Sequence, residues 1–306
     1  MNKKGILLLG GGGFLGQSLA RRLSSQDFTV HLITPHAINT MASNIFIHQG
    51  SMDDKRILDK VIPECQAIVH LASSTNPGNS ARHPALEARH NITPSLNFLE
   101  ILQLYDAFHL IFVSSGGTVY GNPQSIPVDE THPLVPLSYY GAGKIALEAF
   151  FKTLAKPPQK NVTIVRPSNL YGPGQMLRPG FGIIHTMLER VRSGQVMEIW
   201  GDGETIRDFL YIDDMVTAIN LLIDLPADNG VYNIGAGIGH SLNQVKSIIE
   251  KVCNKKLKFK YRTKRLSDVE CVILDNSRFV QLTDWQPETT FEDGILLTWQ
   301  WIQNQQ

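Results

Sequence analysis

The sequence predicts an α/β fold built on a doubly wound parallel sheet. Short, continuously apolar runs recur along the first 170 or so residues, as expected for strands that are covered on both faces. Helix-patterned segments separate these runs, and a glycine-rich turn directly follows the first of them. A chain of 306 residues is long enough for one large α/β unit with a smaller lobe.

The first part of the chain, residues 1–172, is predicted to form a sheet domain. Its six predicted strands cover residues 7–9, 29–33, 45–48, 67–71, 109–114 and 162–166. Leucines four residues apart predict a helix after the first strand, and a second helix is expected from Lys55 to Val61. A long helix is predicted from about Pro84 to Tyr105, with a kink or a late start at Pro94.

Turn residues become more frequent from about residue 173, which predicts a second, smaller α/β lobe over 173–306. Residues from about 205 to 235 are expected to return to the first domain. The predicted strands of this part cover 197–200, 230–234 and 257–261. Its helices are expected around Met187, from a capping box at Ser241 to Cys253, and from Phe291 to Ile302.

Composition excludes several classes of partner. Lys+Arg and Asp+Glu both number 28, so no global field attracts nucleic acid or an anionic membrane. The three cysteines are far apart and lack metal-ligand spacing, which favours a reduced compartment and no metal site. The apolar run near the N-terminus is too short for a signal peptide or a membrane span, so we expect a cytoplasmic protein.

The glycine-rich turn, LLGGGGFLG, predicts a dinucleotide site. Gly10, Gly13 and Gly16 have GxxGxxG spacing between a strand and a helix. Backbone N–H groups in such a turn approach a diphosphate, and the N-terminal dipole of the helix points at the same charge. The second strand ends in Thr34-Pro35-His36, neither the carboxylate that favours NAD nor the Arg that favours NADP. The choice between the two cofactors therefore stays open at this position.

A tyrosine and a lysine follow a Pro-rich loop, at the start of an apolar helix. Tyr140 and Lys144 are four residues apart, so a helix places them on one face. A Lys ammonium beside a Tyr phenol favours the phenolate and lowers the pKa of the phenol from about 10. The pair can therefore provide a general base near neutral pH.

Together these motifs resemble the extended short-chain dehydrogenase/reductases, most closely their UDP-glucose/UDP-N-acetylglucosamine 4-epimerase branch. Nearly the whole chain takes part, since the motifs GGGGFLG, VHLAS, SSGGTVYG, YGAGK, RPSNLYGPG, GDGETIRDFLYIDD, YNIGAG, RLSDV and DWQP occur in the family's order. The resemblance implies a Rossmann-type lobe holding a nicotinamide cofactor and a C-terminal lobe holding a nucleotide sugar. It also implies a homodimer through the helices that bear Lys144 and Asn91, and a place in polysaccharide biosynthesis.

The resemblance assigns site residues motif by motif. Tyr140 would be the acid/base, and Lys144 would hold the nicotinamide ribose while lowering the pKa of Tyr140. The expected cofactor-binding residues are Gly10, Gly13, Phe14, Leu15, Gly16, Met52, Leu71, Ala72, Ser73, Asn91, Ser114, Tyr140, Lys144 and Pro167. The expected substrate-binding residues are Asn169, Arg207 and Arg265 at the nucleotide diphosphate and Val272 beside the sugar C2 substituent. Because Val272 is small, we expect N-acetylhexosamines to be tolerated.

Four positions depart from the family's pattern. Thr34 and Ser51 stand where acidic residues are common, and His83 stands where a Lys often reaches the cofactor phosphates, with Arg82 beside it. Gly116 takes the place of the catalytic Ser or Thr. If the strand direction persists, residues 114, 116 and 118 face one side, so Ser114 or Thr118 could supply the hydroxyl, and we favour Thr118.

The predicted reaction is inversion at C4 of a UDP-sugar through a 4-keto intermediate, with NAD regenerated in each cycle. One alternative is a 4-keto-sugar reductase that consumes NADPH, which the missing carboxylate at Thr34 keeps open. A second alternative is a dinucleotide-binding sensor without turnover, to which Gly116 gives weight and the Tyr140–Lys144 pair does not. A 4,6-dehydratase or decarboxylase would carry an acidic residue just before VYG, where this chain has Gly117-Thr118.

Overall fold

The structure is a computed structural model that describes residues 4–39, 42–81, 83–156, 158–177, 182–226, 228–263 and 269–305. The chain divides into two compact units. The first unit comprises residues 1–114, 139–166 and 216–232. The second unit comprises residues 115–138, 167–215 and 233–306.

A seven-stranded parallel sheet of the Rossmann type is the centre of the first unit, as predicted. The strand order is β10-β6-β5-β4-β1-β2-β3. The chain first adds β2 and β3 on one side of β1 and then adds β4, β5, β6 and β10 on the other, as in doubly wound folds. The strands are β1 (Gly5–Leu9), β2 (Thr29–Thr34), β3 (Ile45–Gln49), β4 (Cys65–His70), β5 (Phe108–Val113), β6 (Lys160–Pro167) and β10 (Val231–Ile234). Strands β1 and β5 are buried at every residue, which explains their unbroken apolar sequences.

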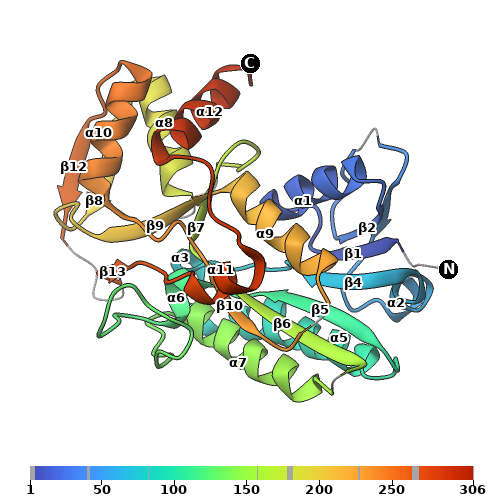
Figure 1. The fold of residues 1–306 in the computed structure, drawn as a ribbon. Helices are drawn as coiled ribbons and strands as arrows, with labels where there is room; N and C mark the ends of the chain where they lie inside the picture. The colour runs from blue at the N-terminus through green and yellow to red at the C-terminus, as the bar shows by residue number, and fades with distance from the viewer. Residues whose placement is uncertain are drawn as a thin grey trace. The chain divides into compact units, whose positions relative to one another are not determined.

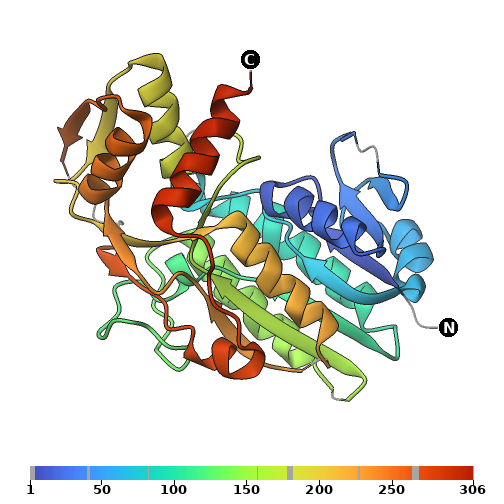
Figure 2. The same cartoon turned by 45° about the horizontal axis from the view of Figure 1, so that its top comes forward.

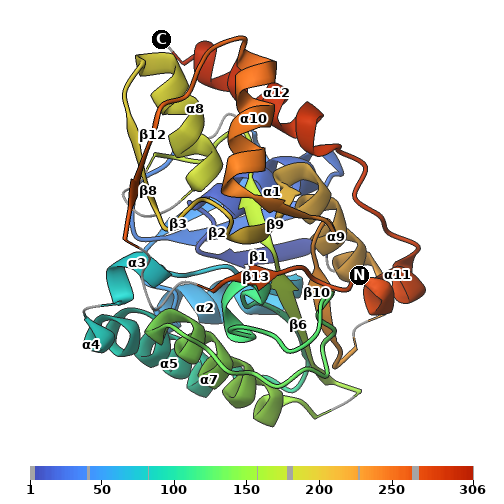
Figure 3. The same ribbon diagram turned by 90° about the vertical axis from the view of Figure 1, so that its left-hand side faces the viewer.

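Helices cover both faces of this sheet (Figures 1 and 3). Three of them pack their apolar stripes on one face: α2 (Lys55–Val61), α5 (Thr93–Leu102) and α7 (Tyr139–Leu154). The other face is covered by α1 (Phe14–Ser25) and α9 (Ile212–Asp224). Short helical turns complete the connections: η1 (Ile62–Glu64), α3 (Pro77–Ser80), α4 (Pro84–Glu87) and η2 (Ala88–Ile92).

The predicted long helix from Pro84 to Tyr105 is interrupted. It begins as α4, passes through one π-helical turn, η2, and continues as α5, which ends at Leu102. A π turn spans one more residue than an α turn, so it changes which side chains face the neighbouring helix. Pro94 lies in the first turn of α5, where its missing N–H costs little, which confirms the late start expected there.

The prediction that the strand direction continues past Ser114 is wrong. Strand β5 ends at Val113, and residues Gly116–Val119 form a single helical turn, α6. The amide of Val119 donates to the carbonyl of Ser115 at 3.1 Å, which closes that turn. On a helix, residues two apart point in different directions, so the alternation argument for residues 114, 116 and 118 fails.

The second unit contains two further small sheets. In one, β11 (Gly239–Ser241), β9 (Ile206–Tyr211) and β13 (Cys271–Val272) lie in that order, and β7 (Asn169–Tyr171) also pairs with β9. In the other, β8 (Met197–Trp200) pairs with β12 (Phe259–Arg262). Both strands of the second sheet lie at the positions predicted for them to within two residues.

Helices α8 (Ile183–Ser193), α10 (Leu242–Cys253) and α12 (Phe291–Gln303) of the second unit pack against one another (Figure 2). A shorter helix, α11 (Ser277–Thr283), precedes α12. The predicted capping box is confirmed: Ser241 accepts from the amide of Gln244, whose side chain accepts from the amide of Ser241. Among the described residues, no helix combines the length and the apolar character that crossing a membrane requires.

Candidate functional site

The glycine-rich turn joins β1 to α1 at the carboxyl edge of the sheet. The amides of Gly10 and Gly11 donate to the carbonyl of Ile33 at 3.0 and 3.3 Å, which holds the turn beside the end of β2. Gly10 has φ +81°, and a Cβ there would lie 2.7 Å from the backbone of Ala72. A Cβ on Gly16 would lie 2.7 Å from the Cα of Gly11. Only glycine fits at both positions.

Helix α1 begins at Phe14, with Gly13 as its N-cap. Glycine offers no capping side chain, so the first amides of α1, including those of Phe14, Leu15 and Gly16, point out of the helix end without an intrahelical acceptor. A turn of bare backbone followed by free helical amides is a cradle for a diphosphate. The residues present therefore fit the dinucleotide that the sequence predicted.

The end of β2 is closed by Thr34. This residue is 3% exposed, and its hydroxyl donates to the carbonyl of His36 at 3.3 Å. A Cβ on Gly12 would lie 2.5 Å from the Thr34 oxygen, so the hydroxyl packs directly against the glycine-rich turn. Ser51, the other departure at this end, is exposed and bonds to Asp53, whereas Met52 beside it is buried.

The loop after β4 is held by Asn91 from the π turn. Leu71 and Ala72 are half-buried and Ser73 is exposed, as suits residues that line a ligand. Asn91 is buried; its carbonyl accepts from the amide of Ser74 at 2.8 Å. Its Nδ2 donates to the hydroxyl of Thr75 at 2.6 Å and to Glu87 at 2.8 Å. Asn91 thus shapes the loop on which predicted cofactor contacts lie.

Helix α7 carries the predicted catalytic pair near its N-terminus. Tyr140 is half-buried and Lys144 is 4% exposed. The Lys144 Nζ lies 5.7 Å from the centroid of the Tyr140 ring and donates to the carbonyl of Val113, at the end of β5, at 3.0 Å. The α-helical spacing thus places the two side chains next to each other, as predicted.

Burial acts on the charge of Lys144. Loss of solvent lowers the pKa of Lys144 to about 8, and the carboxylates of Glu87 and Glu148 oppose this change. The charge of Lys144 therefore depends on the balance between burial and these two carboxylates. Burial, with help from the Lys144 charge, also lowers the pKa of His70 to about 3, so His70 is neutral.

One turn after Lys144, a buried ion pair between Glu148 and Arg166 joins α7 to the sheet. Glu148, one turn after Lys144, accepts from Nη2 of Arg166 on β6 at 2.6 Å and from its Nε at 3.0 Å. The hydroxyl of Ser114 donates to the same carboxylate at 2.5 Å. Ser114 is 3% exposed, and its hydroxyl is therefore turned into this network. The Ser114 hydroxyl is thus engaged by Glu148, and the catalytic hydroxyl expected at Thr118 stays a prediction.

Thr118 lies on α6, in the second unit. Its side chain is half-buried, and its hydroxyl makes a long bond of 3.4 Å to the carbonyl of Ser115. Gly117, beside it, faces Asn169: a Cβ on Gly117 would lie 3.5 Å from the Asn169 amide. Gly117 and Asn169 are therefore neighbours within the second unit.

The predicted substrate residues that the structure describes lie together in one small sheet of the second unit. Arg207 on β9 pairs in register with Val272 on β13, and β7, which begins at Asn169, pairs with β9 on the residues after Arg207. The Arg207 guanidinium donates to the carbonyl of Ile206 at 2.8 Å. Val272 is 1% exposed. Arg265 and Arg82 lie outside the described residues.

Asp208 organises this sheet, although the sequence analysis did not single it out. Its carboxylate is 1% exposed and accepts from the amides of Ala236, Gly237 and Leu274 at 2.8 to 3.2 Å. Burial raises the pKa of Asp208, and the backbone donors oppose this rise. Its carbonyl accepts from the Asn169 amide at 3.0 Å. The backbone of Asp208 therefore holds the Asn169 side chain against β9.

Three buried carboxyl groups, those of Glu87, Glu148 and Asp208, are thus the functional candidates that sequence reasoning missed. Glu148 could have been recognised as a candidate, because it is the single acidic residue in the apolar segment IALEAFF and lies one turn after Lys144. Pro167 is buried at the end of β6, and His83 is exposed at the start of α4. Over the described residues, no group of three His, Cys, Asp or Glu side chains has the arrangement of a metal site.

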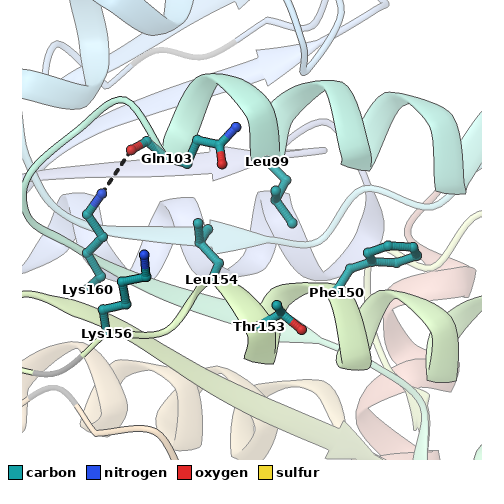
Figure 4. Close-up of a pocket in the computed structure, with 7 residues that line it drawn as sticks. All are labelled: Leu99, Gln103, Phe150, Thr153, Leu154, Lys156 and Lys160. Atoms are coloured by element: carbon teal, nitrogen blue, oxygen red, sulfur yellow. Dashed lines mark hydrogen bonds between the residues drawn. The ribbon is translucent and has the colours of Figure 1, made fainter.

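A separate hollow lies between α5 and α7 at the far end of the first unit (Figure 4). Its lining is apolar at Leu99, Phe150 and Leu154, and Lys160 donates across it to the carbonyl of Gln103 at 2.8 Å. It lies beside the start of β6, the edge of the sheet opposite the glycine-rich turn. The hollow is therefore not part of the cofactor site.

Comparison with known proteins agrees with this geometry. Residues 6–235 match the model of the NAD dependent epimerase/dehydratase family. The chain belongs to this family. NAD is the family's cofactor, which confirms the cofactor expected from the resemblance. The match covers the sheet of the first unit from Ile6 onward and also β7, β8 and β9 of the second.

Relatives of this epimerase/dehydratase family member align along almost its full length. A Methanocaldococcus jannaschii protein, provisionally named a UDP-glucose 4-epimerase, is 32% identical over 98% of both chains. The UDP-glucose 4-epimerase of Thermotoga maritima, solved with UDP-glucose, is 30% identical over 98% of this chain and 99% of that one, with a TM-score of 0.90.

A third relative acts on a different sugar. The UDP-N-acetylglucosamine 4-epimerase of Methanobrevibacter ruminantium, solved with UDP-N-acetylmuramic acid, is 26% identical over all of both chains, with a TM-score of 0.90. Family members of the same fold thus include enzymes named for both kinds of sugar.

Proposed function

We propose that the protein is a UDP-sugar 4-epimerase that interconverts UDP-glucose and UDP-galactose or the corresponding N-acetylhexosamine pair. The observation that carries the proposal is the buried Lys144 one helical turn from Tyr140, on a chain that carries the diphosphate cradle and aligns end to end with 4-epimerases. The small size of the side chain at Val272 supports acceptance of an N-acetyl group.

The chain's own groups would divide the work as follows. Gly10 to Gly16 would hold the cofactor diphosphate, and Lys144 would hold the nicotinamide ribose. NAD, when bound, accepts a hydride and gives it back. Tyr140, as the phenolate, would take the proton from the sugar O4 and later return it, while the Lys144 ammonium stabilises the phenolate charge.

The substrate residues would anchor the nucleotide rather than the sugar. Arg207 and Arg265 present guanidinium groups suited to phosphate oxygens, and Asn169 adds an amide donor. A sugar tethered by its diphosphate can present either face to the same base. The Thr118 hydroxyl would replace the one lost at Gly116, and Thr118→Val should then lower kcat by about 10²-fold.

The decisive experiment uses the purified protein without added cofactor. UDP-glucose and UDP-N-acetylglucosamine are each incubated with it, and the C4 epimers are measured by NMR. Conversion of either sugar supports the proposal, and Tyr140→Phe should abolish it while the bound NAD is retained. Turnover of a 4-keto sugar with NADPH alone would instead identify a reductase, and cofactor binding without any turnover would identify a sensor.

The proposal includes a homodimer in the cytoplasm that serves polysaccharide biosynthesis. The dimer would form through α5 and α7, and Phe150 on α7 is 46% exposed on a face that such contact would cover. Sedimentation of the wild-type protein and of Phe150→Glu tests this part: the charge should dissociate the dimer.

A further inference from the structure

A second buried carboxylate lies near the catalytic pair. Glu87, the last residue of α4, is 3% exposed. The hydroxyl of Thr75 and the amide of Asn91 both donate to it, the latter at 2.8 Å. Both donors are neutral, so they satisfy the carboxylate oxygens without cancelling the charge.

Gly143 lets this carboxylate reach helix α7. A Cβ on Gly143 would lie 2.7 Å from the Cγ of Glu87 and closer still to its Oε1. The residue after Gly143 in the chain is Lys144. The π turn, η2, contributes as well, because it places Asn91 where its amide holds the Glu87 carboxylate toward α7.

The charged groups around Lys144 differ in how far a partner balances their charge. Glu148, on the same helix, is paired with Arg166 through two nitrogens, so much of its charge is balanced. His70 on β4 is neutral, and Arg89 and His90 on η2 are exposed. Tyr140 on α7 is the remaining ionisable group beside the ammonium. Of the two buried carboxylates that act on Lys144, Glu148 has a cationic partner, whereas the described ion pairs include none with Glu87.

We propose that Glu87 is a positioning residue that keeps Lys144 protonated and, through Lys144, sets the pH at which Tyr140 ionises. The inference rests on the proposed roles of Tyr140 and Lys144. The charge relation agrees with it: of the two carboxylates that raise the pKa of Lys144 against burial, Glu87 has the larger effect.

The central variant is Glu87→Gln, which keeps the shape and an acceptor oxygen but removes the charge. Without that charge, Lys144 loses its proton at lower pH, and Tyr140 then ionises at higher pH, by about one pH unit. Glu87→Asp retains the charge and should restore most of the wild-type profile. Glu100→Gln, an exposed acid on α5, is the matched control.

A further variant separates charge from structure. Thr75→Val removes the hydroxyl bond to Glu87 and leaves the charge, so it should lower stability or NAD affinity without moving the pH profile. Gly143→Ala pushes the carboxylate away from α7 and should shift the profile in the same direction as Glu87→Gln. If Glu87→Gln fails to fold, Gly143→Ala decides the question.

The readout is the ultraviolet absorbance of the Tyr140 phenolate in the NAD-bound protein, titrated with base and corrected with Tyr140→Phe. Burial raises the pKa of Tyr105 and Tyr211 to about 12, so these rings ionise outside the range of interest. A Glu87→Gln profile that coincides with those of wild type and Glu100→Gln would overturn the inference. Because no substrate is present, a failure of the proposed 4-epimerase activity would appear separately, as missing turnover in the wild type.

Discussion

Glu148 and Arg166 form an ion pair in which both side chains are 3% exposed and Nη2 lies 2.6 Å from Oε2. The pair joins the catalytic helix to β6 and also accepts the hydroxyl of Ser114, at the end of β5. A buried pair of this kind contributes little net stability, but loss of one partner leaves the other charge without compensation.

Glu148→Gln should therefore lower the free energy of unfolding by about 3 to 5 kcal/mol, because Arg166 stays buried and unpaired. Arg166→Met should cost a similar amount. The double variant Glu148→Leu/Arg166→Met should recover a large part of the loss, as measured by guanidinium denaturation. The control is Lys55→Met, which breaks the exposed Lys55–Asp59 pair and should cost less than about 1 kcal/mol. Additive single losses would contradict the coupling.

Gly16→Ala should remove bound NAD. The new Cβ would meet the Gly11 backbone at 2.7 Å and distort the diphosphate cradle. Gly194→Ala is the matched control, since Gly194 has φ +67° and open space around it; the cost there is backbone strain of about 1 to 2 kcal/mol. The NAD content of each purified variant checks this prediction. A Gly16→Ala protein with a full complement of NAD would refute it.

Stability should rise with pH through the titration of Lys144. Burial lowers the folded-state pKa of Lys144 to about 8 from 10.5, so between these values the unfolded chain holds a proton that the folded chain has released. Below about pH 8 the folded protein buries the charged ammonium, which lowers the free energy of unfolding by the full amount, and this loss becomes smaller as the pH rises. Relative to Lys144→Met, the wild type should gain about 2 kcal/mol of unfolding free energy from about pH 7.5 to about pH 10. Parallel curves for the two proteins would show that Lys144 keeps its ordinary pKa.

Asp208→Asn should weaken binding of the nucleotide sugar and leave cofactor content unchanged. The Asn side chain offers one acceptor oxygen where the carboxylate offers two, so a buried backbone donor is left unpaired at a local cost of about 1 to 3 kcal/mol. The resulting shift of the strand that carries Arg207 should raise KM. Asp202→Asn is the control, because exposed Asp202 accepts from the Glu204 amide with one oxygen. Unchanged KM with reduced kcat would contradict a role in substrate binding.

Local signals in the sequence were enough for much of the fold. The capping box at Ser241 has its predicted position because residues 241 and 244 alone form it, and β8 was recognisable from the alternation of apolar and polar residues at its start. The helical turn α6 was missed because Gly116 and Gly117 have poor helix propensity, and the closing contact comes from the carbonyl of Ser115.

The charged interior was less predictable than the catalytic pair. Tyr140 and Lys144 share one helix, so their spacing was sufficient to place them together. Glu148 pairs with Arg166 on a separate strand. The Asp208 carboxylate accepts from the amides of Ala236, Gly237 and Leu274, which are distant in the chain. The tertiary fold brings such partners together, so their contacts cannot be predicted from a short segment of sequence.

The π turn over Ala88–Ile92 links two contacts through one residue, because Asn91 holds both the Ser74 amide and the Glu87 carboxylate. Each residue of a helix turns the chain by about 100°, so deletion of one residue here would rotate Glu87 away from Asn91 and Gly143. A single deletion would then loosen the loop at Ser74 and release Lys144 from its counter-charge. The length of this segment therefore matters more for these contacts than the identity of its exposed residues.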